Sequence, residues 1–576
     1  MRFSLLAPLA ALLATVACAP STVEDAHHNE LAARTADAAA VEAHAALEGR
    51  AVDYRLVKTT SGQVRGVDDG NGVYRWLGVR YGADTSGAKR FTKSTLAPSA
   101  DGVFDASNAG PSCPSVQSAS SYAKLAFTGQ QIDPPSKWSE DCLRVNIWAK
   151  QSTRRGAKAR LAANGKGGAA VLFWVYGGSF NTGTATIPLY RGNNFAANED
   201  VIVVSFAYRH SIFGNPLSDY VTKQKENAAD GWNFGLLDME LALEWVQKNI
   251  ARFGGDPSKI TLFGGSSGST MIDAYSYAHV DKPAVASSLI VSSGSVIGLQ
   301  LASGTKSIFN FARYDSEWNT VSDSLGCGRS GGQTQFQCMQ KVPMMDLVNA
   351  TVKLITSDNT VQFGPTPDGH TWFQDYALRS NTGRVSKIPT MIGTNSNEAT
   401  LFSDDPGNTL IVKISDAAFT PPLWTCPAMT NAADRARVGA PTWRYQYHGA
   451  WEDFTQGYPA LGSYHFAECP MLFGTYPPYY LGNPSKKATI TPEQDKTSRL
   501  MQHAWAEFAR DPVNGLPKLG WPQYNPTQKT LANIALNNQP QLTLTQTNFI
   551  DQGGCAVTVP SFNFLQGLRQ TIVSLW

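Results

Sequence analysis

One serine of the chain lies in a pattern that suits nucleophilic chemistry. Ser266 is the third residue of G-G-S-S-G, which follows the β-branched and aromatic run Ile260 to Phe263 and precedes the helix-compatible segment Thr270 to Tyr277. In a strand, sharp turn and helix of this kind, the flanking glycines let the turn push one hydroxyl into a cleft. We therefore predict that Ser266 is a nucleophile.

The chain also contains a second match to G-x-S-x-G, which serves as an internal control. G-R-S-G-G at residues 328–332 follows no predicted strand and lies between Cys327 and Cys338. We interpret this second match as a loop, because the pattern has meaning only between a strand and a helix.

A serine hydroxyl is a poor nucleophile at neutral pH, so Ser266 needs a base and a carboxylate that orients the base. Among Ser-His-acid hydrolases with this serine turn, the histidine comes last in the chain. His465, in G-S-Y-H-F-A-E, is the preferred base. His448, at the end of a predicted strand, is its competitor, and His503 is expected on an amphipathic helix.

The acid is expected a few residues past a strand, where an orienting carboxylate can project towards the histidine. Glu398, in I-G-T-N-S-N-E-A-T-L-F, meets that condition and is preferred. Asp404 and Asp405 lie nearby, but the adjacent Pro406 favours a plain turn.

The oxyanion that forms during acyl transfer needs preorganised N–H donors. Ser267, the residue after the nucleophile, supplies one donor. Gly178 and Ser179 follow a predicted buried strand and are expected to supply the others. The alternative is that Gly177 and Gly178 only permit a sharp turn.

The elements that must position these residues alternate between strands and helices. This pattern predicts an α/β fold with a large, mostly parallel sheet and helices on both faces, preceded by an antiparallel opening over Leu56 to Tyr81. The expected strands are Leu143 to Trp148, Ala169 to Val175, Val201 to Phe206, Ile260 to Phe263, Ile388 to Gly393 and Thr442 to Tyr447. The expected helices include Trp232 to Phe253 and Ser498 to Arg510. The first of these helices is expected to end at Gly254-Gly255, and a turn is expected at Asp256-Pro257.

Composition limits the possible partners. Of 576 residues, 42% are hydrophobic and 16% charged, with 48 basic and 46 acidic side chains. This near-neutral balance gives no field that would favour nucleic acid or an anionic membrane. The oligomeric state is left open.

The ends of the chain differ in character. Residues 1–19 carry the basic, apolar and small-residue regions of a secretory signal peptide, although a lipoprotein interpretation through Cys18 is a weak alternative. Residues 20–50 are expected to form a pro-segment or loose arm, and residues 51–576 one catalytic domain. No later run approaches the roughly 20 apolar residues of a membrane helix, so we expect a secreted protein without a membrane span.

Seven cysteines remain beyond Cys18, and closeness in sequence makes two pairs the most economical. These are Cys113 with Cys142 and Cys327 with Cys338, although sequence alone leaves the connectivity open. No pairing is chosen for Cys426, Cys469 and Cys555. The spacing does not suit zinc, so no metal is expected. Asn349 is the acceptor of an N-A-T sequon and is expected at the surface.

Taken together, the motifs resemble those of the type-B carboxylesterase and lipase family, which includes the cholinesterases, and in particular its secreted fungal-type carboxylesterases. The matching stretches are W-L-G-V-R-Y, S-E-D-C-L-R-V-N-I-W, Y-G-G-S-F, N-I-A-R-F-G-G-D-P-S-K-I-T-L-F-G-G-S-S-G, G-T-N-S-N-E, H-F-A-E, P-M-L-F-G, A-W-A-E-F-A-R-D-P and W-P-Q-Y. The resemblance implies an α/β-hydrolase fold and a small-molecule ester as substrate. It implies a triad of Ser266, Glu398 and His465, oxyanion donors at Gly178, Ser179 and Ser267, disulfides Cys113–Cys142 and Cys327–Cys338, and an ion pair of Arg90 with Glu140.

The chain also departs from the family pattern. Gly265 stands where the family usually has glutamate, Ser267 where it has alanine, and Ser179 where it has a third glycine. The choline-binding tryptophan of the cholinesterases is replaced by the neighbourhood of Ile132, so choline specificity is not expected.

The expected function is that of a secreted, cofactor-free serine ester hydrolase with a broad preference for short to medium acyl chains. The 66 residues between Glu398 and His465 are fewer than in many family members, which favours an open pocket. Apolar residues of the first cysteine loop are expected to pack on the body rather than form a lid: Tyr122, Leu125, Phe127, Ile132 and Trp138. The alternatives are a lipase or sterol esterase acting on long chains and, more distantly, a catalytically silent adhesion or binding protein.

Overall fold

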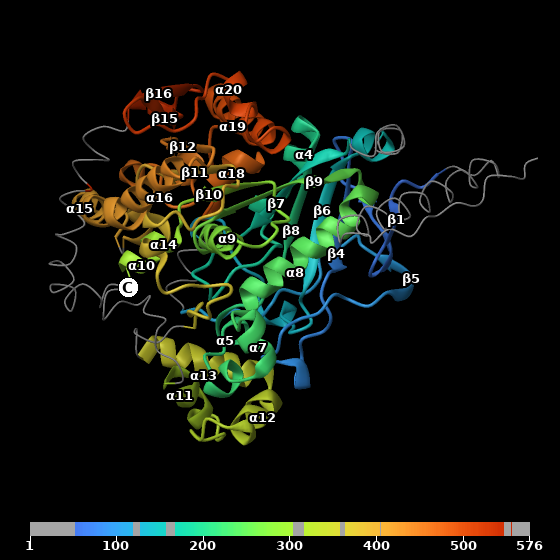
Figure 1. The fold of residues 1–576 in the computed structure, drawn as a ribbon. Helices are drawn as coiled ribbons and strands as arrows, with labels where there is room; N and C mark the ends of the chain where they lie inside the picture. The colour runs from blue at the N-terminus through green and yellow to red at the C-terminus, as the bar shows by residue number, and fades with distance from the viewer. Residues whose placement is uncertain are drawn as a thin grey trace, which may run out of the picture.

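A large mixed sheet forms the centre of the molecule (Figure 1). The computed structural model describes residues 52–118, 127–156, 167–302, 316–357, 363–403, 405–546 and 555, so the predicted signal peptide and arm lie outside the described residues. The sheet has 11 strands in the order β16-β15-β12-β11-β10-β9-β7-β8-β6-β4-β3.

The middle of the sheet is parallel, and its strands are almost entirely buried because both faces are covered. The parallel strands are β7 (Ala169–Val175), β8 (Ile202–Phe206), β9 (Gly255–Gly265), β10 (Ser288–Ser292), β11 (Thr390–Asn395), β12 (Thr442–Tyr447) and β15 (Lys529–Ile534). The carboxyl ends of these strands meet at one edge of the sheet, where the candidate site residues follow them.

Antiparallel strands close both sides of the sheet. At one side lie β3 (Val67–Asp68), β4 (Val73–Arg80) and β6 (Arg144–Lys150), and at the other β16 (Leu542–Gln546). Two small sheets lie apart from it: β1 (Leu56–Thr59), β2 (Gly62–Arg65) and β5 (Ala100–Asp105), and the pair β13 (Tyr479–Tyr480) and β14 (Asn483–Lys487). The antiparallel opening predicted over Leu56 to Tyr81 is confirmed.

Helices cover both faces of the sheet, and a group of three lies at one end of the molecule (Figure 1). One set contains α8 (Phe234–Asn249), α9 (Ser267–Ala278), α10 (Val296–Ala302) and α16 (Cys426–Arg437). The other contains α4 (Asn193–Glu199), α18 (Glu468–Phe473) and α19 (Pro492–Arg510). The end group is α11 (Ser316–Ser324), α12 (Gln333–Lys341) and α13 (Met344–Ser357), which contribute to a smaller apolar cluster together with residues such as Phe91 and Phe213. Shorter helices are α5 (Ser211–Gly214), α6 (Asp219–Thr222), α7 (Lys225–Asp230), α14 (Tyr376–Asn381), α17 (Glu452–Thr455) and α20 (Gly515–Lys518).

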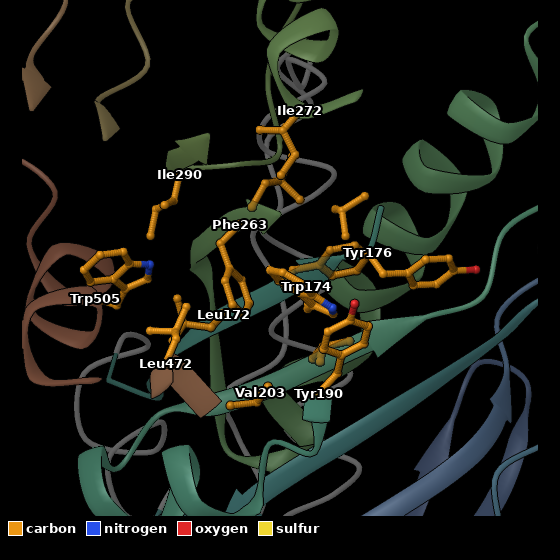
Figure 2. Close-up of a cluster of buried hydrophobic side chains, with 14 of the residues drawn as sticks. Leu172, Trp174, Tyr176, Tyr190, Val203, Phe263, Ile272, Ile290, Leu472 and Trp505 are labelled. Atoms are coloured by element: carbon orange, nitrogen blue, oxygen red, sulfur yellow. The ribbon is translucent and has the colours of Figure 1, made fainter. Parts of the chain in front are cut away.

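The main core lies between the sheet and its helices. Figure 2 shows Phe263 of β9 at its centre, with Ile272 of α9 approaching from one side and Leu472 and Trp505 from another. The Trp174 and Phe263 rings lie 4.9 Å apart. Burying such large aromatic side chains stabilises the strands that carry the candidate site.

Most of the predicted elements are present, with shifts at their ends. The β12 bounds are as predicted, and the helix predicted over Trp232 to Phe253 appears as α8 followed by the 3₁₀ turn η4 (Ile250–Phe253). The turn predicted at Asp256-Pro257 is wrong, because β9 already begins at Gly255, where it pairs with Ala169. The second G-x-S-x-G match follows α11 rather than a strand and is a loop, as predicted.

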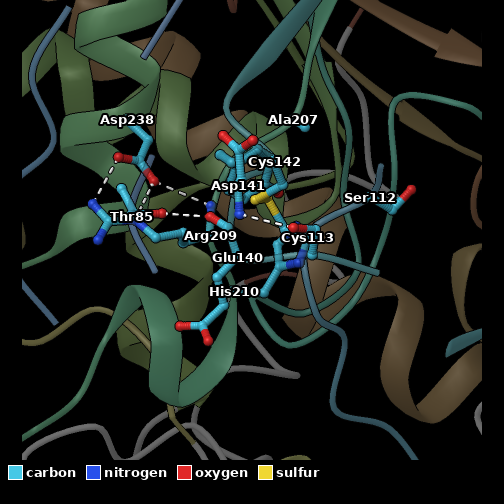
Figure 3. Close-up of a disulfide and its surroundings, with 12 residues drawn as sticks. Thr85, Ser112, Cys113, Glu140, Asp141, Cys142, Ala207, Arg209, His210 and Asp238 are labelled. Carbon is cyan, nitrogen blue, oxygen red and sulfur yellow. Dashed lines mark hydrogen bonds and ion pairs between the residues drawn. A yellow bond between two sulfur atoms is a disulfide. The ribbon is translucent and has the colours of Figure 1, made fainter. Parts of the chain in front are cut away.

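Both economical disulfides are present, and a third joins Cys426 to Cys555, which leaves Cys469 free and buried. Figure 3 shows the Cys113–Cys142 bond beside the Glu140 carbonyl, which accepts a 2.6 Å hydrogen bond from the Thr85 hydroxyl. Glu140 also receives the Arg90 guanidinium at 2.7 Å, which is the predicted ion pair.

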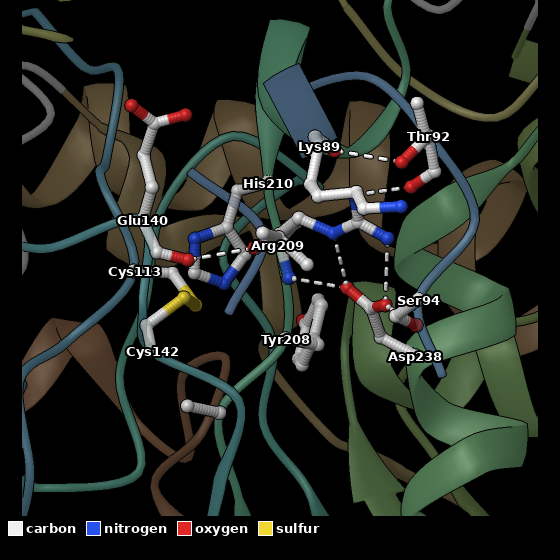
Figure 4. A network of polar contacts seen from close by, with 12 residues as sticks. Lys89, Thr92, Ser94, Cys113, Glu140, Cys142, Tyr208, Arg209, His210 and Asp238 are labelled. Atoms are coloured by element: carbon white, nitrogen blue, oxygen red, sulfur yellow. Dashed lines mark hydrogen bonds and ion pairs between the residues drawn. A yellow bond between two sulfur atoms is a disulfide. The ribbon is translucent and has the colours of Figure 1, made fainter. Parts of the chain in front are cut away.

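A second buried ion pair fixes the turn after β8. Figure 4 shows the Arg209 guanidinium against the Asp238 carboxylate of α8, with both contacts at 2.8 Å, and Ser94 donating to the same carboxylate at 2.6 Å. His210, the next residue, contacts the Tyr176 hydroxyl at 2.9 Å. These contacts hold the turn after β8 beside the turn after β7, which is one part of the candidate site.

Candidate active site

Ser266 lies in a strained turn between β9 and α9. Its backbone has φ 55° and ψ −129°, which is uncommon for a residue with a side chain. Ser266 is half-buried, whereas both of its neighbours are buried. The Ser266 N–H donates to the Ser292 carbonyl at 3.0 Å, and its hydroxyl has no hydrogen-bond partner among the described residues. Strain held at one serine with an available hydroxyl is the geometry that the G-x-S-x-G pattern predicts.

Close backbone packing around the turn requires its glycines. A Cβ on Gly268 would lie 2.2 Å from the Val175 carbonyl oxygen, and one on Gly177 would lie 2.8 Å from the Ser266 Cβ. The start of α9 therefore packs directly against the end of β7. Ser266 and the glycine turn after β7 share one wall of the site.

Glu398 and His465 form a direct pair. The Glu398 Oε2 and His465 Nδ1 atoms are 2.5 Å apart, and both side chains are buried. The second carboxylate oxygen, Oε1, accepts hydrogen bonds from the Ser293 hydroxyl at 2.6 Å and from the Asn395 N–H at 2.7 Å. Because the carboxylate occupies Nδ1, the Nε2 atom of the neutral imidazole is left as the basic nitrogen.

The two loops that carry the pair are joined by their own hydrogen bonds. Glu398 begins the 3₁₀ turn η5 (Glu398–Phe402) just after β11. The Asn397 N–H donates to the Ser463 carbonyl at 3.0 Å, and the His465 N–H donates to the Glu398 carbonyl at 3.3 Å. The relative positions of acid and base are thus set by the backbone as well as by the side chains.

The turn after β7 has the form of a cradle of N–H groups. Gly178, Ser179 and Phe180 all have positive φ values, of 128°, 54° and 63°. Ser179 therefore takes a left-handed conformation that a third glycine would adopt more easily. The Phe180 N–H donates to the Ser267 hydroxyl at 3.3 Å. Within the part of the chain that the structure describes, the N–H groups of Gly178 and Ser179 have no acceptor.

Gly265 stands where the family pattern has glutamate, and an aromatic ring occupies the space that a side chain at this position would need. A Cβ on Gly265 would lie 2.7 Å from Cε1 of Phe466, and one on Gly177 would lie 2.8 Å from Cζ of the same ring. Phe466 has a positive φ of 74° and lies edge-on to the His465 ring at 4.9 Å. Phe466 thus links the backbone next to Ser266 with His465.

The competing residues lie elsewhere. His448 contacts the Asn533 side-chain oxygen at 2.9 Å, and burial lowers its pKa. His503 is exposed and contacts Glu199 at 3.1 Å. Asp405 is exposed, and Asp404 lies outside the described residues. Among the described residues, only His465 is paired with the carboxylate predicted to be the acid.

Several residues of the site were not predicted from the sequence. Ser293 and Asn395 hold Glu398, and Phe402 and Trp424 lie beside His465 with ring centroids 5.5 and 5.4 Å away. Asn395 belongs to the motif G-T-N-S-N-E, so its position was a usable signal. The two aromatic residues carried no signal, since their contact with His465 arises only from tertiary packing.

A second carboxyl group lies behind the pair. Burial raises the pKa of Glu468 to about 7, and the nearby Glu398 charge adds to this effect. The Asn395 side chain bridges the two acids, since its N–H₂ group donates to Glu468 at 2.6 Å while its backbone N–H donates to Glu398. Repulsion between two buried carboxylates favours one charge at a time.

Comparison with known proteins identifies the protein family. A profile of the Carboxylesterase family matches residues 53–420 and 408–550. The chain belongs to the carboxylesterase family. It is 31% identical over 441 residues to Secreted lipase 5 of Gibberella zeae, an alignment that covers 73% of this chain and 78% of the lipase. It is 30% identical over 481 residues to the chlorogenic acid esterase of Aspergillus niger, covering 82% and 86% of the two chains. The structure of a thermophilic pNB esterase matches with a TM-score of 0.67 and 25% identity, covering 88% of this chain and all of the other.

These matches confirm the predicted α/β-hydrolase fold, and they establish the carboxylesterase-family chain as a carboxylic ester hydrolase whose substrate is a small-molecule ester. Its disulfides are those of a protein from an oxidising compartment. None of the helices in the described ranges is long and apolar enough to cross a membrane.

The described part of the first cysteine loop packs on the body of the carboxylesterase-family protein. Ile132 is buried, Phe127 packs against the main core, and Trp138 packs against the smaller apolar cluster. Tyr122 and Leu125 lie outside the described residues. Asn349 is exposed on α13, which agrees with the surface position predicted for its sequon.

Proposed function

We propose that the protein is a secreted serine esterase that works through an acyl-enzyme on Ser266, with a broad preference for short to medium acyl chains. The observation that carries the proposal is the buried pair of Glu398 with His465, at 2.5 Å, beside the strained Ser266 turn. A carboxylate on Nδ1 orients the imidazole so that Nε2 can act on the serine hydroxyl.

In the proposed reaction, Ser266 Oγ attacks the ester carbonyl carbon while its proton passes to His465 Nε2. The backbone N–H groups of Gly178, Ser179 and Ser267 receive the negative charge on the carbonyl oxygen. The alkoxide leaves with the proton from His465. Water then attacks the acyl carbon while His465 Nε2 takes one of its protons. The bond from the acyl carbon to Ser266 Oγ breaks, Oγ takes the proton back from His465, and the carboxylic acid is released.

The proposal is tested by turnover of p-nitrophenyl acetate with Ser266→Ala and with Ser330→Ala. Loss of the nucleophile should lower kcat by on the order of 10⁴-fold or more. Ser330 belongs to the exposed second match to G-x-S-x-G and is the matched control, which should keep full activity. Equal turnover of wild type and Ser266→Ala would refute the mechanism. Absence of turnover in the wild type would favour a silent binding protein.

A second candidate is a lipase or sterol esterase, and one observation favours it. The helix α15 (Thr409–Thr420) contacts the turn η5 that carries Glu398 and exposes three aliphatic side chains. These are Leu410, Ile411 and Ile414, exposed by 67%, 46% and 60%. Large exposed aliphatic groups near a site can contact a lipid surface.

Rates on p-nitrophenyl esters from acetate to palmitate, below and above the solubility limit, separate the two candidates. An esterase should act on soluble short and medium chains with a broad preference, because an apolar pocket distinguishes neighbouring chain lengths by at most about 1–3 kcal/mol per methylene. A rate increase when droplets form, with long chains preferred, would establish the lipase alternative.

A further inference from the structure

The imidazole of His465 has three aromatic rings as close neighbours. Its ring centroid lies 5.4 Å from that of Trp424, 5.5 Å from that of Phe402 and 4.9 Å from that of Phe466. Trp424 and Phe402 are themselves stacked, with centroids 5.8 Å apart and planes inclined by only 9°. These two rings therefore form one aromatic wall beside the imidazole.

The two halves of the wall come from different elements. Phe402 ends the turn that Glu398 begins, so the acid and this ring are placed by the same five residues. Trp424 lies in a π-helical turn (Pro421–Thr425) between α15 and α16. Single π-turns are rare inside helices and occur frequently at functional sites.

The π-turn is fixed at both ends. Before it, the Thr420 hydroxyl accepts a 2.9 Å hydrogen bond from the Ala399 N–H, which joins α15 to the acid turn. At its end, the Thr425 carbonyl accepts from the buried Arg444 guanidinium of β12 at 3.2 Å. Cys426 follows directly and is bonded to Cys555. Two hydrogen bonds and one disulfide thus fix the turn that carries Trp424 beside His465.

The two aromatic rings are expected to stabilise the positive charge that the reaction places on His465. Aromatic faces attract cations whose centres lie within about 6 Å of the ring centroid, and tryptophan does so most strongly. In the proposed mechanism the imidazole is neutral at rest and becomes an imidazolium when it takes the Ser266 proton. An interaction that is stronger with the imidazolium than with the imidazole lowers the barrier of the chemical step.

We propose that Trp424 is a positioning residue of this enzyme: with Phe402 it holds the His465 ring in place and stabilises the imidazolium that forms during acyl transfer. This inference rests on the proposed role of His465 as the base. Trp424 acts through His465 and transfers no proton itself.

The test uses Trp424→Phe, Trp424→Leu and Trp424→Ala in the full chain, with p-nitrophenyl acetate as substrate. The Leu and Ala variants should lose about 3- to 30-fold in kcat with a smaller change in KM, while Phe, which keeps an aromatic face, should stay within about 2-fold of wild type. In Trp424→Leu the acidic limb of the kcat/KM profile should move to lower pH by about 0.4 to 1 unit, since the protonated base loses its aromatic neighbour.

Trp232→Leu is the matched control. Trp232 is also half-buried, and it packs against a separate cluster of Val221, Phe234 and Leu237. Its replacement should lower the melting temperature without moving kcat or the acidic limb, which separates a structural loss from a catalytic one.

Two results would overturn the inference: wild-type kcat and pH profile in Trp424→Leu, or equal losses in the Phe and Leu variants. His465→Ala distinguishes this failure from failure of the proposed function. If His465→Ala is inactive while Trp424→Leu is normal, only the role of Trp424 is wrong. If His465→Ala keeps its activity, the proposed mechanism itself is wrong.

Discussion

The close approach of Phe466 to Gly265 predicts that the effect of a substitution at Gly265 depends strongly on the side chain at position 466. A Cβ added at Gly265 would lie 2.7, 3.2 and 3.4 Å from three atoms of the Phe466 ring. Such an overlap forces the ring to move and costs about 1–3 kcal/mol. Because the same ring contacts His465 at 4.9 Å, Gly265→Ala should lower both the melting temperature and kcat.

The assay is a double-mutant cycle with Gly265→Ala, Phe466→Ala and the pair, measured by melting temperature and by kcat/KM. Phe466→Ala removes a buried aromatic side chain and should by itself cost about 3–5 kcal/mol. In that background the methyl group at position 265 has room, so Gly265→Ala should become nearly neutral, with a coupling energy of about 1–3 kcal/mol.

Gly255 at the other end of β9 provides the control. A Cβ there would lie 2.8 Å from an Ile250 side-chain carbon, far along the strand from Phe466. Gly255→Ala should therefore cost the same with and without Phe466. If Gly265→Ala behaved in the same additive way, the argument that Phe466 occupies the space beside Gly265 would be refuted.

Two further predictions concern the acid side of the site. Burial raises the pKa of Glu468 in the folded protein to about 7, above its ordinary value of 4.5. The folded protein therefore holds an extra proton between these two pH values, and the free energy of unfolding falls as pH rises through that window. Glu468→Gln keeps an acceptor for Asn395 but does not titrate, so its stability relative to wild type should rise by about 3 kcal/mol from pH 4.5 to 7 and level off above; parallel melting curves across that range would contradict this. Ser293→Ala removes one of the hydrogen bonds to the Glu398 carboxylate and should lower kcat by about 10-fold, while KM stays near the wild-type value. An unchanged kcat for Ser293→Ala would show that Asn395 and His465 alone orient the carboxylate.

The local pattern was sufficient to predict the elements that carry the nucleophile. The G-G-S-S-G turn lies between an apolar run and a helix-compatible run, and the structure places Ser266 between β9 and α9. The bounds predicted for β12 agree with the structure, because aromatic and polar residues alternate in T-W-R-Y-Q-Y and turn residues bound it on both sides. In contrast, β10, β15 and β16 were not predicted, since their short runs take strand form only by pairing with neighbours.

The surroundings of the histidine depended on contacts that no local pattern encodes. Trp424 lies 26 positions after Glu398 in sequence yet contacts His465, and the Phe466 ring fills the space beside Gly265, where the sequence indicated only a missing acid. The Cys426–Cys555 bond could not be chosen for the same reason, because three cysteines without close neighbours allow several pairings.

That bond also determines how the chain would respond to proteolysis. Cys426 and Cys555 enclose β12, α18, α19 and His465, whereas Ser266 and Glu398 precede the enclosed segment. A protease that cuts between Cys426 and His465, for example at the exposed residues 457–459, would produce two pieces, with the nucleophile and acid on one and the base on the other. The disulfide would keep the pieces covalently joined, so a nicked enzyme should run as one species on a non-reducing gel and lose activity only when a reductant is added.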